Sequence, residues 1–206
     1  MSRRSLGAPA DRLAECYPAV MTQPARRPAT YDDILALPEH LVGEIVDGEL
    51  SVSPRPAVRH AISTSALGAT LVTRVQFGDG GPGGWWILDE PELHLGEHVV
   101  VPDIAGWRRE RMPEPPREAF IPITPDWICE ALSPATARFD RTRKVPLYAQ
   151  LGVPYLWLLD TNLETVETYR LESNHWVLLA THAGDDIVRA EPFEAIEIDL
   201  KRLWGR

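Results

Sequence analysis

Two carboxylates in apolar, strand-like surroundings are the residues of this 206-residue chain best suited to chemistry. Asp103 follows the β-branched run Val99–Val101 and Pro102, so we expect it at the end or bend of a strand. Glu130 lies in the apolar run Trp127–Leu132, where an ionised carboxylate needs a cation or hydrogen bonds to offset the cost of burial. Turn chemistry alone explains an aspartate at a strand end, so the pair is more informative than Asp103 by itself.

Two explanations account for Glu130. It forms a buried ion pair with an arginine, or it binds a metal ion, and its own surroundings do not decide between them. Asp103 on a neighbouring strand favours the metal, because carboxylates at adjacent strand ends form a hard-oxygen site suited to magnesium or manganese. We therefore expect a Mg²⁺ or Mn²⁺ site at this edge of a sheet.

A lysine follows these carboxylates on a predicted helix. Asp140, Lys144 and Tyr148 are spaced by four residues, so they line one helical face. Pro146 is expected to kink this helix or to mark a late start. The chain has only one other lysine, Lys201. A compact ammonium at position 144 suits the orientation of a water or the binding of a phosphoryl oxygen better than a guanidinium does.

Three interpretations of Lys144 stay open at this point. It occurs by chance at an exposed position, it serves a reacting phosphate from a partly exposed position, or it is the buried partner of Glu130. In the second case Lys144→Ala changes stability within about 1 kcal/mol. In the third case the same change leaves a buried carboxylate without its cation and costs roughly 3–5 kcal/mol.

Glu44 and His60 complete the set of candidates. Glu44 precedes a predicted hairpin and is either a further ligand or water-positioning base, or an ordinary residue at a strand start. His60 lies near the start of a long helix, where a lone histidine is more often structural or exposed than catalytic. The chain has no paired Cys or His spacing for zinc, no glycine-rich phosphate loop and no Gly-x-Ser-x-Gly motif.

The periodicity of the sequence predicts a mixed α/β (α+β) fold, with a central sheet flanked by helices. Thr30 and Asp33 form a capping box at a short helix that ends near Pro38, and Asp47-Gly48 is a hairpin turn signal. The other expected elements are a helix over residues 57–77, two paired strands over 85–95 and 99–107, a central strand over 127–132, a helix over 138–151 that stops at Gly152, a strand over 154–159 and a strand-rich part over 165–204.

Composition indicates one globular domain, over residues 29–206, with a disordered extension over residues 1–28 in which Met21 is a second candidate start. No apolar run approaches the ~20 residues that span a bilayer, and no secretory signal follows the N-terminal arginines, so we expect a cytoplasmic protein. Cys16 and Cys129 are not expected to form a disulfide.

The net charge of −9 opposes broad nonspecific binding of nucleic acid, but it does not exclude a nuclease, because metal ligands are acidic until the cation binds. Two local basic clusters are either solvated surface or contacts to nucleic acid. They are Arg108, Arg109 and Arg111, and Arg138, Arg141 and Arg143 with Lys144.

The order of these motifs resembles the Uma-two family of restriction-endonuclease-like proteins, within the PD-(D/E)XK nuclease superfamily. The resemblance runs from about residue 30 to the C-terminus. The motifs that carry it are Glu44-Ile-Val-Asp-Gly-Glu-Leu, His60, Val101-Pro102-Asp103-Ile104, Glu130-Ala-Leu-Ser133-Pro134-Ala-Thr136, Asp140, Lys144, Tyr148 and Gly152-Val-Pro-Tyr-Leu-Trp157-Leu-Leu-Asp160.

The resemblance implies a restriction-endonuclease-like fold and hydrolysis of phosphodiester bonds. Asp103 and Glu130 are then the metal ligands, joined by the carbonyl of Ala131, with Glu44 as an additional acidic residue. Leu132 stands where the superfamily has lysine, so Lys144 is similar to a relocated lysine, and Tyr148 supports it. The expected partner is nucleic acid, DNA rather than RNA, with no membrane association and with a homodimer as a candidate assembly.

Two rival functions remain. A catalytically silent binding or assembly module that keeps the fold is favoured by the acidic net charge and opposed by the intact set of Asp, Glu and Lys. A glycosidase that uses two carboxylates is weakly supported, because scattered tryptophans are more often core residues than a sugar-binding cleft.

The N-terminal extension yields a first prediction. Deletion of residues 1–20 is expected to leave the melting temperature nearly unchanged, because this segment lacks the apolar surface of a core segment. Thermal denaturation of the full-length and shortened chains measures the difference, and a loss of several degrees would contradict the assignment.

Overall fold

The computed structural model describes residues 27–54 and 56–206. The predicted extension over residues 1–28 lies outside this part except for its last two residues, and so do Met21 and Cys16. Cys129 is a buried free thiol. Within the described ranges, no helix combines the length and the apolar content needed to cross a bilayer.

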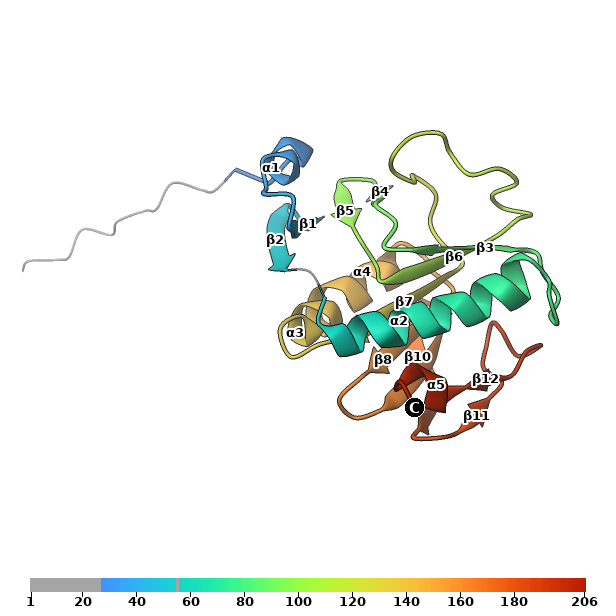
Figure 1. The fold of residues 1–206 in the computed structure, drawn as a ribbon. Coiled ribbons are helices and arrows are strands. Elements are labelled where there is room, and N and C mark those ends of the chain that lie inside the picture. The colour runs from blue at the N-terminus through green and yellow to red at the C-terminus, as the bar shows by residue number, and fades with distance from the viewer. Residues whose placement is uncertain (1–26, 55) are drawn as a thin grey trace, which may run out of the picture.

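A six-stranded mixed sheet forms the centre of the fold (Figure 1). Its strand β7 is buried along its whole length, as predicted for a central strand. β7 runs parallel to β8 and antiparallel to β6. In spatial order the strands are β10 (His175–Ala183), β9 (Thr165–Glu172), β8 (Tyr155–Asp160), β7 (Trp127–Leu132), β6 (Ile104–Arg108) and β3 (Trp85–Asp89).

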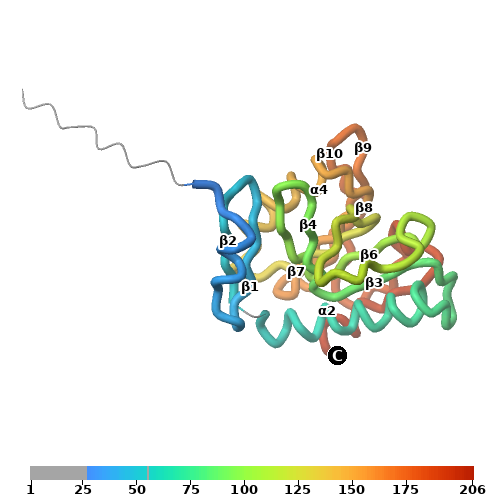
Figure 2. The backbone as a smooth tube through the Cα atoms, turned by 90° about the horizontal axis from the view of Figure 1, so that it is seen from above, coloured from blue at the N-terminus to red at the C-terminus, as the bar shows by residue number. Residues whose placement is uncertain are grey.

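Helices cover both faces of this sheet. The predicted long helix is present as α2 (Val58–Leu71) and its continuation η1 (Val72–Gln76), a π-helical turn. It extends along one face of the sheet, as Figures 1 and 2 show from two directions. Leu67 and Leu71 are fully buried in the core cluster on this side. A second core cluster lies on the other face, against α4 (Val145–Gln150). Both faces of the sheet are therefore covered by packed core residues.

A second sheet of four strands contributes to the core on the α4 side, through residues such as Val46 and Leu93. The predicted hairpin between β1 and β2 is confirmed, and Asp47 and Gly48 at its turn have φ values of 52° and 73°. Positive φ at both positions is typical of a type I′ turn. In spatial order the strands are β2 (Glu49–Pro54), β1 (Leu41–Val46), β5 (His98–Val100) and β4 (Leu93–Leu95).

A short helix, α1 (Tyr31–Leu35), precedes this sheet and packs on β1. The predicted capping box is present, since Thr30 and Asp33 satisfy each other's backbone N–H groups. The helix ends earlier than the predicted boundary near Pro38.

The expectation of two paired strands over residues 85–95 and 99–107 is wrong in one respect, because each segment is divided between the two sheets. β3 pairs with β6 in the large sheet, whereas β4 pairs with β5 in the small one. Glu90 interrupts the first segment with a left-handed φ of 45°, and Pro102, which has no N–H to donate, interrupts the second. The chain therefore leaves the large sheet after β3 and returns to it just after Asp103.

The predicted helix over residues 138–151 is present as three joined segments. α3 (Ala137–Phe139) leads into η2 (Asp140–Lys144), a π-helical turn, and η2 leads into α4. The wide turn accommodates Pro146, which cannot donate a helical hydrogen bond. Gly152, with a φ of 72°, follows the end of the helix as predicted.

The C-terminal part is rich in strands, as predicted, with one addition. Ser173 and Asn174 have positive φ at the turn between β9 and β10. β11 (Ile187–Val188) pairs with β12 (Ile198–Asp199), and the helix α5 (Leu200–Leu203) follows. α5 was not predicted, because four residues are too few to show a helical period.

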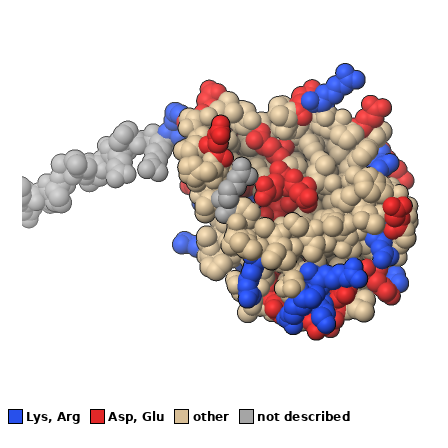
Figure 3. Space-filling view, viewed as in Figure 1, with Lys and Arg blue, Asp and Glu red and all other residues tan. Residues whose placement is uncertain are grey.

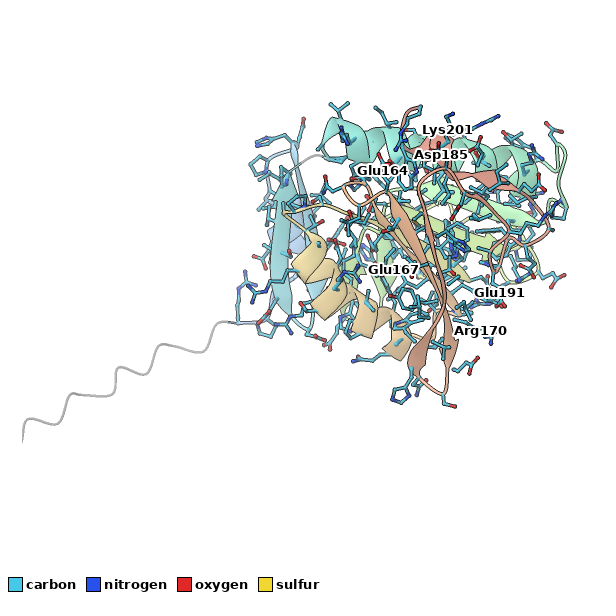
Figure 4. The ribbon with its side chains drawn as sticks, turned by 90° about the horizontal axis from the view of Figure 1, so that it is seen from below. Glu164, Glu167, Arg170, Asp185, Glu191 and Lys201 are labelled. Carbon is cyan, nitrogen blue, oxygen red and sulfur yellow. The ribbon has the colours of Figure 1, made fainter. Side chains whose placement is uncertain are left out.

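Surface ion pairs lie within this part and between it and the η2 turn (Figure 4). Arg170 of β9 lies 3.0 Å from a Glu191 carboxylate oxygen, and Arg141 of η2 lies 3.1 Å from Glu167 of β9. Exposed pairs of this kind contribute at most about 1 kcal/mol each. These four side chains do not line the cavity described next.

Candidate active site

A cavity of about 340 Å³ opens where the four-stranded sheet approaches the ends of β6 and β7. On the face shown in Figure 3, acidic side chains gather near the centre. Among residues 27–54 and 56–206, one lysine, Lys144, and one histidine, His60, line the cavity. The carboxylates that line it are Glu44, Glu90, Asp103, Glu130 and Asp140.

Lys144 is the buried cation of this cavity, with 2% of its surface exposed. Its Nζ lies 2.9 Å from Glu44 Oε1, 2.8 Å from Glu130 Oε1 and 3.3 Å from the Val101 carbonyl oxygen. These three acceptors match the three N–H donors of an ammonium. Burial lowers the pKa of Lys144, but the charges of Glu130 and Glu44 raise it well above its ordinary value, so Lys144 stays protonated.

This geometry corrects two expectations. Lys144 is not partly exposed, and the partner of Glu130 is a lysine rather than an arginine. The helical spacing predicted correctly that Lys144 and Tyr148 share a face. It did not indicate burial, which depends on β1 and β7 meeting this helix from two separate parts of the chain.

Glu130 is held from a second side by Tyr148, whose hydroxyl donates to Oε1 at 2.5 Å. Burial raises the pKa of Glu130 well above its ordinary value, the nearby carboxylates add to this effect, and the Lys144 ammonium opposes it. Glu44 accepts a further hydrogen bond, of 2.8 Å, from the backbone N–H of Val101. The network therefore joins β1, β7 and the η2–α4 helix at one point.

Asp103 lies immediately before β6, and its side-chain carboxylate accepts a hydrogen bond from the backbone of the neighbouring strand β7. Its Oδ2 accepts a hydrogen bond of 2.7 Å from the backbone N–H of Ala131 in β7. Its Oδ1 lies 2.5 Å from His60 Nε2 at the start of α2. Burial lowers the pKa of His60, but its hydrogen bond with Asp103 and the charges of Asp103 and Glu90 raise it above the ordinary value. The contact with Asp103 therefore favours the protonated, cationic form of His60.

Strand register aligns the backbone positions of three of the cavity's acidic residues. β6 pairs with both β3 and β7 through Ile104. One residue beyond these pairs, the same register sets Asp103 opposite Glu90, which follows β3, and opposite Glu130 of β7. The backbone N–H of Glu90 donates to the Asp103 carbonyl oxygen at 3.0 Å, which extends the first pair by one residue.

Sequence reasoning missed two of the cavity's carboxylates. Glu90 was not singled out, and Asp140 was noted for its helical spacing and as one of the family motifs, without a role in the site. A Glu-Pro dipeptide at a strand end is typical of a turn, so Glu90 gave no separate signal. Asp140 is 4% exposed and accepts a side-chain hydrogen bond from Thr136. Its position one helical repeat before Lys144 was the available signal.

The two arginine clusters are largely engaged by the protein itself. Arg108 and Arg109 stack over tryptophan rings at 4.6 and 4.2 Å, and Arg111 lies 2.9 Å from Asp126. In the second cluster, Arg143 lies 2.8 Å from Glu49. These contacts favour the solvated-surface interpretation for most of both clusters.

The chemistry of this donor set fits a hard divalent cation. Among the lining residues that the structure describes, the carboxylates outnumber the cationic groups, and a divalent ion would offset this negative charge. Within residues 27–54 and 56–206, no three His, Cys, Asp or Glu side chains converge closely enough to hold an ion by themselves. The set therefore fits an ion held by two carboxylates and completed by backbone oxygen and water, an arrangement that Mg²⁺ commonly adopts.

Comparison with protein-family models matches residues 30–201 to a family described as "Uma2: Putative restriction endonuclease". The chain belongs to the Uma2 family. The family resemblance expected from the ordered motifs is confirmed, including the N-terminal boundary near residue 30.

A similar solved structure is the crystal structure of "a putative nuclease belonging to DUF820 from Anabaena variabilis ATCC 29413". It shares 24% sequence identity, the match covers 86% of this chain and 98% of that chain, and the TM-score is 0.68. This likeness shows the shared fold, which is restriction-endonuclease-like as expected. Comparison with curated proteins found no match.

The buried position of Lys144 predicts a large loss of stability on its removal. Lys144→Ala is expected to lower the free energy of unfolding by roughly 3–5 kcal/mol, because Glu130 and Glu44 lose their common cation. Lys201→Ala, at the exposed second lysine, serves as the control and should change stability by no more than about 0.5 kcal/mol. Urea denaturation measures both.

A double variant tests the cause of that loss. Adding Glu130→Gln to Lys144→Ala should recover part of the stability, because the uncompensated buried charge is removed. A Lys144→Ala protein as stable as the Lys201→Ala control would show that the ion pair does not hold the site together.

Proposed function

We propose that this Uma2 protein is an endonuclease that depends on Mg²⁺ or Mn²⁺ and hydrolyses phosphodiester bonds in nucleic acid, DNA in preference to RNA. One observation carries the proposal. The carboxylates of Asp103 and Glu130 and the ammonium of Lys144 line a single cavity at the strand ends of a restriction-endonuclease-like fold.

Asp103 and Glu130 would hold the cation, with the backbone carbonyl of Ala131 as a further ligand. The bound cation supplies Lewis-acid polarisation of the phosphate and lowers the pKa of a nearby water. Ala131 follows Glu130 on β7, and its N–H already fixes Asp103. Glu130 and Ala131 are therefore positioned by β7, and Asp103 by its position immediately before the neighbouring strand β6.

Lys144 would change partners during the reaction. Its three N–H donors are taken by Glu44, Glu130 and Val101 in the structure. When a cation compensates Glu130, Lys144 can turn one N–H to the phosphate or to the attacking water. Glu44 would keep the ammonium in place and Tyr148 would keep Glu130 in place, since each holds its partner by a direct contact.

Binding of nucleic acid would depend on few contacts, because the net charge is −9 and most arginines of the two clusters have partners within the protein. We infer that the cation itself supplies much of the attraction for phosphate at the cavity. A homodimer would double the number of such contacts. A cytoplasmic location agrees with a nucleic-acid substrate and with the buried free thiol of Cys129.

A second function is favoured by one specific observation. Each charged group of the Lys144 network already has a partner within the protein, as expected of a scaffold that needs neither metal nor substrate. A catalytically silent module would bind nucleic acid or protein without cleaving it. The two functions differ in one measurable property, which is cleavage that depends on metal.

The nuclease function predicts cleavage of DNA by the purified full-length protein when Mg²⁺ or Mn²⁺ is present, and none with a chelator. Asp103→Asn should reduce the rate by about 100-fold or more, because even groups that only orient metal ligands are worth about 10–100-fold. The assay compares single-stranded DNA, double-stranded DNA and RNA over a metal titration.

Asp79→Asn, at an exposed aspartate outside the cavity, is the matched control and should cleave at the wild-type rate. Calorimetric titration with Mn²⁺ should show binding that Asp103→Asn weakens strongly. A wild-type protein that binds Mn²⁺ and cleaves no nucleic acid would decide for the silent module.

A further inference from the structure

Asp140 is a buried carboxylate of the cavity that the roles described above do not use. It is 4% exposed, and within the described part of the chain it makes no ion pair. The two other buried glutamates share Lys144, and Asp103 is held by His60 and a backbone N–H. Burial of a carboxylate without a cation is costly, so its presence at the cavity wall indicates a functional role.

The surroundings of Asp140 are mainly acidic. Thr136 donates a side-chain hydrogen bond to it, and the Lys144 charge acts on it from the same π-helical turn, although the donors of Lys144 are directed to other acceptors. Burial raises the pKa of Asp140 to about 6, and these two groups oppose the rise. The other charged groups that act with Asp140 from neighbouring elements are Glu44 of β1, Asp103 before β6, Glu130 of β7 and His60 of α2.

Two uses of such a carboxylate can be compared. As a metal ligand it would have to converge with Asp103 and Glu130, but no three such side chains are grouped closely enough in residues 27–54 and 56–206. As a general base it needs only to line the space where water and phosphate meet and to be ready to accept a proton near neutral pH. Asp140 meets both conditions of the second use.

We infer that Asp140 is the general base of the proposed phosphodiester hydrolysis, which accepts a proton from the attacking water. The role rests on the proposed nuclease function. The water's O–H bond breaks as its oxygen bonds to phosphorus, and the proton moves to an Asp140 carboxylate oxygen. The bond from phosphorus to the leaving oxygen of the strand breaks, and the proton on Asp140 then passes to that oxygen through solvent.

The test compares the pH dependence of kcat for the wild type and Asp140→Asn. The wild-type rate should fall on the acidic side of the profile, because a protonated base cannot accept the proton. Asp140→Asn should lose about 10²–10⁴-fold in kcat and lose this acidic limb, with KM and Mn²⁺ affinity nearly unchanged. Asp185→Asn, at a surface residue labelled in Figure 4, is the control and should keep the wild-type profile.

Thr136→Val gives a second, directional readout. Its hydroxyl lowers the pKa of Asp140, so its removal should move the acidic limb of kcat to higher pH without abolishing activity. Suppose that the wild type is active, that Thr136→Val leaves the acidic limb unchanged and that Asp140→Asn still shows this limb. This result would overturn the role of Asp140 and leave the nuclease function standing.

A stability measurement separates the remaining outcomes, since it needs no activity. The raised pKa means that the stability contributed by protonated Asp140 is lost as pH rises through about 6. The melting temperature of Asp140→Asn minus that of the wild type should therefore be larger at pH 8 than at pH 4. If this difference is found but the wild type cleaves nothing, both the nuclease function and the role of Asp140 as general base are overturned. If the difference in melting temperature does not change between the two pH values, the assignment of Asp140 as a buried carboxylate without a cation is overturned.

Discussion

The ion pairs of the Lys144 ammonium with Glu44 and Glu130 are the contacts on which the candidate site depends. Glu44 belongs to the small sheet, Glu130 to the central strand of the large sheet, and Lys144 to the helix that covers it. Three elements from distant parts of the chain are therefore fixed relative to one another by one buried charge. Because removal of one partner leaves the others buried and uncompensated, the arrangement is sensitive to single substitutions.

The same interaction explains why the cavity remains acidic. In the described part of the cavity, the Lys144 ammonium offsets only part of the negative charge of the carboxylates around it, even with His60 beside Asp103. A divalent cation would relieve this imbalance, and it would also free a donor of Lys144 for a phosphate. Stability without metal and reactivity with metal would then be two states of one network, with Glu130 exchanging one positive partner for another.

Much of this could be predicted from sequence because the signals are local. The apolar run around Glu130, the hairpin at Asp47 and the spacing of Lys144 and Tyr148 each follow from a few neighbouring residues, and the order of motifs identified the family. The burial of Lys144 could not be predicted in this way, since it results from two sheets meeting the helix. The division of the 85–107 region between two sheets was missed because its breaks depend on single backbone conformations, such as that of Glu90.

The central claim is that the acidic cavity holds a divalent cation between Asp103 and Glu130. A crystal structure of the full chain grown with Mn²⁺, with anomalous scattering measured at the manganese edge, tests it most directly. The account predicts one strong anomalous peak within coordinating distance of the Asp103 and Glu130 carboxylates and the Ala131 carbonyl, with Lys144 moved away from Glu130. No peak in the cavity at saturating Mn²⁺, with Lys144 still bound to both glutamates, would contradict it.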